Sequence, residues 1–181
     1  MKLHKFYLFA VLFFVLGLAV APAVPAMARG DRAPGANTIY EIASGNDSFT
    51  ILTLALETTG LDAALNGSGQ FTVFAPTDDA FLALEAANPG ILDALINDPD
   101  TLSAVLLYHV TEGRRWSNSV VNRNNPKTIQ MLSGGTITVL PSAVIVDTDS
   151  FGLDSPDSQI VAVDISASNG VIHVVDQVLI P

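Results

Sequence analysis

Apolar residues in the first half of the chain recur at the spacing of an α-helix. One apolar stripe consists of Phe49, Leu52 and Leu56. The preceding pair Asp47–Ser48 predicts the N-cap of this helix, and Gly60 predicts its end.

Two further helices are predicted where an asparagine or aspartate precedes a proline. Asn88–Pro89 and Asp98–Pro99 each place a capping side chain before a proline, whose missing N–H is harmless at the first helical position. Apolar residues follow both pairs at helical spacing, at Ile91, Leu92, Leu95 and Ile96 and then at Leu102, Val105 and Leu106. The chain before Tyr108 is therefore expected to be mainly helical.

Beyond Tyr108 the apolar pattern changes to that of β-strands. The predicted strands are short, rich in β-branched residues and bounded by Gly, Pro, Ser or Asp; they cover residues 136–140, 143–147, 159–165 and 171–175. Helices mostly in the N-terminal half and strands in the C-terminal half favour an α+β domain over an alternating α/β one.

The segment Phe71–Phe81 combines both patterns, with the sequence FTVFAPTDDAF. It is predicted to run as a strand through Pro76 into a helix whose N-cap is Thr77. Asp78 and Asp79 then fall in the first helical turn, where carboxylates complement the positive end of the helix dipole. A catalytic acid pair is the alternative, but adjacent helical residues point about 100° apart. We therefore favour the capping role.

The pattern of residues 1–28 is that of a signal peptide. A basic start at Met1–Lys5 is followed by a long uncharged apolar run, and small residues lead to a cleavage site after Ala28. We expect secretion and no membrane span after cleavage, with a retained anchor as the alternative. Residues 29–37, rich in Gly, Pro and Ala, are expected to form a flexible leader, and residues 38–181 the folded domain.

Composition and charge narrow the possible functions. The 181 residues include 8 Lys and Arg against 18 Asp and Glu, a formal net charge of −10. This charge argues against nonspecific nucleic-acid binding and against attachment to anionic lipid, because both depend on Lys and Arg. The absence of Cys excludes a disulfide scaffold and a thiol enzyme.

The two histidines beyond the signal peptide lie in apolar surroundings. His109, within the sequence LLYHV, comes seven positions after Leu102 on the apolar stripe of its predicted helix. We expect its side chain in the core, bonded to a backbone group. His173 lies within a predicted strand, and two histidines without Cys provide too few ligands for zinc.

Three blocks of the sequence, in the same order and spacing, resemble the fasciclin domain family. They are FTVFAPTDDAF at residues 71–81, LLYHV at 106–110 and SNGVIHVVDQVLIP at 168–181, the last with a predicted tight turn at Asn169–Gly170. The resemblance covers about residues 38–181. It implies an extracellular fold of helices packed around a wedge of β-strands, and an adhesion or matrix role rather than catalysis. We expect no cofactor.

The resemblance also implies an adhesive dipeptide. In some animal fasciclin domains an Asp-Ile pair just before the closing block is implicated in integrin-dependent adhesion, and Asp164 and Ile165 stand at that place. Strand alternation would turn Val161, Val163 and Ile165 to one face and Asp164 to the other. Ile165 is then expected to pack inward and Asp164 to be available to a partner. An ordinary aspartate at the end of a strand is the alternative.

Four basic residues cluster in the sequence beside the only tryptophan. The five residues are Arg114, Arg115, Trp116, Arg123 and Lys127. One interpretation is a contact patch for an anionic surface sugar or an acidic partner, where Arg supplies forked donors and Trp a flat apolar face. The other is a polar hairpin whose arginines pair with carboxylates of the protein itself.

An acidic loop near Gly152 contains the candidate ligands for calcium. They are Asp147, Asp149, Asp154 and Asp157. Oxygen ligands at this density are compatible with calcium, but their spacing does not fit the EF-hand loop. A solvated acidic loop is the preferred interpretation, so no metal site is predicted.

These observations predict a secreted, single-domain, non-enzymatic protein that binds extracellular matrix or cell-surface protein or polysaccharide. The alternative is a carrier of an apolar ligand such as a carotenoid, because some fasciclin-like proteins that resemble this one bind carotenoids. A hydrolase is disfavoured, since the sequence lacks a Gly-x-Ser-x-Gly elbow.

Overall fold

The computed structural model describes residues 35–147 and 157–181. Its helices are α1 (Ile39–Ser44), α2 (Thr50–Thr59), α3 (Asp62–Leu65), α4 (Asp78–Ala87), α5 (Ile91–Asn97), α6 (Pro99–Tyr108) and α7 (Ser117–Val120). Its strands are β1 (Phe71–Pro76), β2 (Val110–Glu112), β3 (Lys127–Gln130), β4 (Thr136–Val139), β5 (Val144–Asp147), β6 (Ser158–Ala167) and β7 (Gly170–Val175). The predicted signal peptide and most of the leader lie outside the described residues. None of the helices described is long and apolar enough to cross a membrane.

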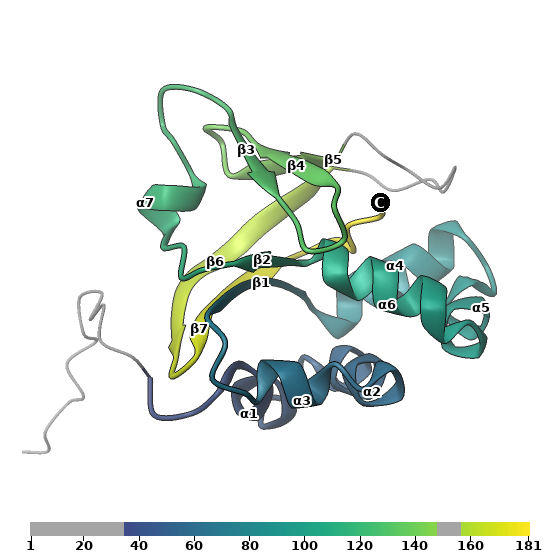
Figure 1. The fold of residues 1–181 in the computed structure, drawn as a ribbon. Coiled ribbons are helices and arrows are strands. Elements are labelled where there is room, and N and C mark those ends of the chain that lie inside the picture. The colour runs from purple at the N-terminus through teal and green to yellow at the C-terminus, as the bar shows by residue number, and fades with distance from the viewer. Residues whose placement is uncertain (1–34, 148–156) are drawn as a thin grey trace, which may run out of the picture. The chain divides into compact units, whose positions relative to one another are not determined.

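Within the described residues, the strands form one seven-stranded sheet in the order β2-β1-β7-β6-β5-β4-β3 (Figure 1). The β1–β7 pair is parallel, and the other neighbouring pairs are antiparallel. The two edge strands are linked to each other. The Thr111 hydroxyl of β2 donates a hydrogen bond to the Gln130 carbonyl of β3 at 2.7 Å, and the Leu132 N–H donates to the Val110 carbonyl at 2.8 Å. The sheet is therefore a nearly closed wedge.

The central strands separate two apolar clusters. Along β1, Val73 and Ala75 belong to the cluster on the side of the helices, whereas Phe74 belongs to the cluster inside the wedge. The helix-side cluster includes Ile39, Phe49, Leu52, Leu56, Phe81, Leu106 and Ile172. The wedge cluster includes Tyr108, Ile129, Ile137, Ile145, Val175 and Leu179. Burial on both faces explains why β1 and β7 are apolar almost throughout.

The α+β prediction is confirmed, with helices mostly before Tyr108 and strands after it. The predicted strands correspond to β4, β5, β6 and β7, and the strand in Phe71–Phe81 corresponds to β1. The elements that were not predicted are α1, α3, α7, β2 and β3. The three helices have six residues or fewer, which is too short to display a helical period. The strand β2 has only three residues, and β3, with the sequence KTIQ, has one apolar residue.

The predicted N-caps of α4 and α6 are confirmed, and the predicted N-cap of α5 is wrong. Asp98 caps α6 by accepting a hydrogen bond from the N–H of Thr101, and Thr77 caps α4 as predicted. Asn88, however, is the C-cap of α4. The N-cap of α5 is Gly90, whose backbone is in the left-handed conformation. The Glu85 carboxylate caps α5 instead, because it accepts hydrogen bonds from the N–H groups of Gly90 and Leu92, at 2.6 and 3.0 Å.

The N-terminus of α2 is capped by a side chain from a different helix. The predicted cap at Asp47–Ser48 is wrong, because Phe49 occupies the N-cap position and makes no capping bond. The Asp78 carboxylate of α4 accepts hydrogen bonds from the N–H groups of Thr50 and Ile51, at 3.2 and 2.8 Å, and from the Thr50 hydroxyl. Asp78 therefore has a capping role, but it joins α4 to α2.

The turn between β6 and β7 is fixed by a buried amide. Asn169 is 3% exposed; its Oδ1 accepts a hydrogen bond from the Ile39 N–H at 2.8 Å. Its Nδ2 donates to the carbonyls of Leu65 and Gly67, at 2.6 and 2.9 Å. A Cβ on the following Gly170 would lie 2.1 Å from a carbonyl oxygen of β1. The Asn-Gly turn thus holds α1 and α3 against the sheet.

Candidate partner-binding face

The candidate residues from two distant parts of the sequence meet at what we call the α7 face, formed by residues 114–123 and residues 161–164 of β6. Figure 1 shows α7 away from α4, α5 and α6, in the connection between β2 and β3. The α7 face thus carries polar and charged side chains that the helical core does not cover.

Asp164 anchors the start of α7. One carboxylate oxygen accepts a hydrogen bond from the Ser117 N–H and the other from the Ser117 hydroxyl, both at 2.6 Å. Asp164 is half-buried, has a φ of 62° and lies in a region of β6 where the register to β7 shifts. Asp164 does not follow the regular strand alternation expected from the sequence, because this irregularity in β6 turns its carboxylate toward α7. Its availability to a partner stays a prediction.

His173 lies beneath this contact and joins β7 to the loop before α7. Its Nε2 is 2.9 Å from the Arg115 carbonyl, and its Nδ1 accepts the Asp164 N–H at 3.4 Å. A carbonyl only accepts, so these partners define a neutral ring with the proton on Nε2. Burial lowers the pKa of His173, although the Arg115 carbonyl and the Asp164 charge oppose that shift.

Serine, aspartate and histidine are present here but are not arranged as a catalytic triad. The Ser117 hydroxyl donates to Asp164 rather than to His173. Both nitrogens of His173 are occupied by backbone groups, so neither accepts a proton from a nucleophile. The arrangement holds α7 against the sheet and does not activate the serine.

Arg114 is a structural residue. Its Nη2 donates to the carbonyls of Ala167 and Ser168, at 2.9 and 3.0 Å, and its Nε donates to the Gln70 side chain at 3.2 Å. The guanidinium carbon lies 5.9 Å from the centre of the Trp116 ring. The inclusion of Arg114 in a patch of exposed cations is therefore corrected, because its guanidinium is directed into the chain.

The other basic residues of the predicted cluster, Arg115, Arg123 and Lys127, do not form one patch. Arg115 is half-buried, donates from Nε to the Glu112 carbonyl at 3.2 Å and lines a hollow of about 400 Å³ beside β2. Arg123 is exposed and lines another hollow, beside α7, while Lys127 is half-buried at the start of β3. Within the described part of the chain, none of these cations forms an ion pair with a carboxylate.

The hollow beside α7 has a volume of about 680 Å³. It is lined by Ser117, Asn118, Val121, Asn122, Arg123 and Val163. Val161 and Val163 of β6 are 57% and 45% exposed, so the expectation that they share an inward face with Ile165 is wrong. The register of β6 shifts twice between Ile160 and Ile165, which breaks the alternation of faces. Ile165 packs against the helix-side cluster as predicted.

The three sequence blocks now have defined places: β1 leading into α4, the end of α6 leading into β2, and β7 with the C-terminal residues. The sequence model of the fasciclin domain matches residues 47–181, well over half of the chain. The chain belongs to the fasciclin domain family.

Similar proteins occur in bacteria and animals. This fasciclin domain is 36% identical over 148 residues to protein sll1483 of Synechocystis sp., covering 81% of the chain and 74% of that protein. It is 32% identical to immunogenic protein MPB70 of Mycobacterium bovis, covering 90% of the chain and 77% of MPB70. It is 31% identical to human periostin, covering 80% of the chain but 16% of periostin. A domain pair from the insect cell adhesion molecule fasciclin I matches with a TM-score of 0.66 at 17% identity, covering 82% of this chain and 52% of that one, which confirms the fold.

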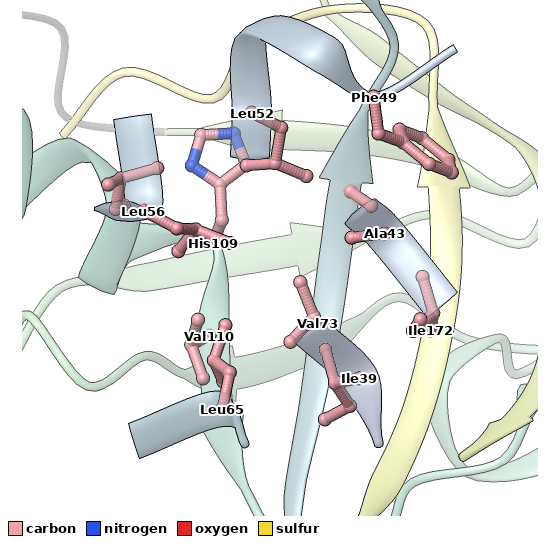
Figure 2. A pocket seen from close by; sticks show the side chains of 12 residues that line it. Ile39, Ala43, Phe49, Leu52, Leu56, Leu65, Val73, His109, Val110 and Ile172 are labelled. Carbon is pink, nitrogen blue, oxygen red and sulfur yellow. The ribbon is translucent and has the colours of Figure 1, made fainter. Parts of the chain in front are cut away.

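The central histidine of this fasciclin domain lies in the helix-side cluster. The Nδ1 of His109 is 2.8 Å from the Val105 carbonyl, and its Nε2 accepts the Leu179 N–H at 2.9 Å. Figure 2 shows the ring beside Leu52 and Leu56, and burial lowers its pKa to about 4. The prediction of a core histidine satisfied by backbone groups is confirmed.

The calcium candidates stay untested in this fasciclin domain. Asp149, Asp154 and the side chain of Asp147 lie outside the described residues, and Asp157 is exposed. Among the side chains described, no group of three or more His, Asp or Glu could hold a metal ion.

The polar lining of the hollow beside α7 was not predicted from the sequence. Asn118 and Asn122 were not selected, although a signal was present in the stretch SNSVVNRNNP at residues 117–126. This stretch is rich in short polar residues that favour turns and loops. Loops on a rigid scaffold are frequent binding sites, so the stretch was a candidate from its composition alone.

Proposed function

We propose that this fasciclin domain is a secreted, non-enzymatic binding module that attaches to extracellular matrix or cell-surface protein or polysaccharide through its α7 face. The observation that carries the proposal is the hollow beside α7, in which exposed apolar, amide and cationic side chains lie together. The signal-peptide pattern of residues 1–28 supports secretion. The similarity to a cell adhesion molecule supports a binding role.

The α7 face is held rigidly enough to present a defined surface. Ser117 is fixed by Asp164, and Val120 at the other end of α7 is fully buried. The loop before α7 is bonded to His173 and, through Arg114, to the β6–β7 turn. Binding to a surface that is ordered in advance avoids the entropic cost of ordering it.

The apolar-carrier alternative is not supported by the interior of the domain. Three small apolar cavities in the described part have volumes of about 10, 20 and 30 Å³. Pockets for small organic ligands have volumes of about 300–1,000 Å³. Enclosing a carotenoid in this interior would require the packed helices and sheet to separate, so we propose the adhesive function alone.

The test uses protein collected from the culture medium of cells that express the full chain. Its intact mass is expected to correspond to a chain that begins at Arg29. The protein is then applied to an array of matrix proteins and polysaccharides, beside the variants Val163→Glu and Leu82→Glu. Both side chains are exposed, at 45% and 56%, so either change should alter stability by no more than about 0.5 kcal/mol.

We expect Val163→Glu to reduce retention on the array, because it places a carboxylate in the hollow, and Leu82→Glu on α4 to leave retention unchanged. Absence of wild-type retention on every component would contradict the binding function. Equal retention of the two variants would show that the partner binds elsewhere.

A further inference from the structure

We propose that the hollow beside α7 is a subsite for an acidic polysaccharide, in which Arg123 pairs with the carboxylate of a uronate residue. This inference rests on the proposed binding function and adds the chemical class of the partner. It is argued from the side chains that line the hollow and from which of their hydrogen-bond donors and acceptors have no partner among the described residues.

The lining of the hollow matches the two kinds of surface that a sugar ring presents. Val121 and Val163 offer apolar contact to ring C–H groups, and Asn118 and Asn122 offer amide donors and acceptors to hydroxyl groups. The volume of about 680 Å³ lies in the range of ligand-binding pockets, about 300–1,000 Å³. The hollow is open to solvent along the exposed part of β6, as a site within a polymer requires.

The polar groups of the hollow are available to a ligand. Oδ1 of Asn122 accepts the Asn124 N–H at 3.0 Å, which leaves its amide donors without a partner among the described residues. The Asn118 side chain likewise has no hydrogen-bond partner within the part of the chain that the structure describes. Ser117 donates its hydroxyl proton to Asp164, so its oxygen can accept a hydrogen bond from a ligand but not donate one.

The net negative charge of the protein restricts the places where a polyanion can bind. The formal net charge is −10, so a polyanion is repelled from most of the surface. Arg114 and Arg115 donate to backbone carbonyls, whereas the Arg123 guanidinium has no partner among the described residues. A guanidinium presents a planar fork that matches a carboxylate with two parallel hydrogen bonds. Arg123 is therefore the cation on the α7 face that is positioned for a uronate.

The test measures retention of the full secreted protein on immobilised polygalacturonate and on the same polymer after its carboxyl groups have been reduced to alcohols. The diagnostic variant is Arg123→Gln. The matched control is Lys127→Gln, which removes a half-buried cation at the start of β3, outside the α7 face. Circular dichroism and the melting temperature of each variant verify that the fold is unchanged.

We expect Arg123→Gln to weaken binding to polygalacturonate about tenfold, since a charged hydrogen bond is lost, and to flatten its salt dependence. Lys127→Gln should remain within about twofold of wild type, and the reduced polymer should bind all three proteins equally weakly. Equal loss in both variants, or equal binding of both polymers, would overturn the inference. Retention on a matrix protein with none on polygalacturonate would overturn it too, but would leave the binding function standing.

Discussion

Replacing Asn169 with alanine tests the physical account of how the helices are attached to the sheet. The buried amide makes three hydrogen bonds, one to α1 and two to the segment around α3. Each such bond contributes about 1 kcal/mol net, and a buried partner left unsatisfied costs about 1–3 kcal/mol. We therefore expect Asn169→Ala to lower the free energy of unfolding by about 4 kcal/mol, a large part of the 5–15 kcal/mol that is typical of a domain.

The assay is equilibrium unfolding in urea, followed by circular dichroism. The control is Asn125→Ala, because Asn125 is exposed and its side chain has no hydrogen-bond partner among the described residues. This control should change the free energy of unfolding by less than about 0.5 kcal/mol. A second variant, Asn169→Asp, keeps the acceptor for Ile39 but directs a carboxylate at two carbonyls. It should be at least as destabilising as alanine at neutral pH.

Equal midpoints and equal slopes of Asn169→Ala and Asn125→Ala in urea would refute the anchoring role of the Asn169 amide. That result would mean that the Ile39 N–H and the carbonyls of Leu65 and Gly67 find water or other partners without loss. A large loss in Asn169→Ala with an unchanged slope would support the assignment, because the change then acts on stability and not on the compactness of the unfolded chain.

Two further predictions concern the cap of α2 and the central histidine. Asp78→Ala should lower the free energy of unfolding by about 1–2 kcal/mol because it removes the cap of α2, whereas Asp79→Ala, at an exposed position, should have almost no effect in the same urea assay. The pKa of His109 is about 4 in the folded protein and about 6.5 in the unfolded chain, so the unfolded chain binds more protons between these values. The stability from neutral His109 is complete above pH 6.5 and falls by about 3 kcal/mol as the pH drops to 4. Urea titrations from pH 4 to 7 should show this loss in the wild type and a flatter profile in His109→Gln; identical profiles would contradict the assignment.

The helix caps show which structural features can be predicted from neighbouring residues and which cannot. Thr77 and Asp98 cap the helices that follow them directly, and both were predictable because donor and acceptor are three residues apart. Asp78 and Glu85 cap helices other than their own, which no local pattern indicates. The difference arises because an end of a helix needs a hydrogen-bond acceptor, but any part of the chain can provide it.

The same contrast holds for the two histidines. The core position of His109 was predictable because it continues the apolar stripe of α6, and its burial follows from that spacing. The role of His173 depends on the Arg115 carbonyl, 58 residues away in the sequence. Its apolar neighbours indicated that it is buried but not which backbone group it contacts.

The sequence by itself determined the fold class, the positions of the longer helices and strands, the buried histidines and the family, because these follow from apolar periodicity and from ordered sequence blocks. Only the tertiary structure decided which polar side chains are exposed on the α7 face and which are bonded within the domain. A register shift in β6 turned Asp164 toward Ser117, 47 residues away, and exposed Val163. The Arg114 guanidinium donates hydrogen bonds to backbone carbonyls, whereas the Arg123 side chain is exposed. Side chains of identical type thus acquired different roles, since hydrogen bonding and burial depend on which chain segments meet in the fold.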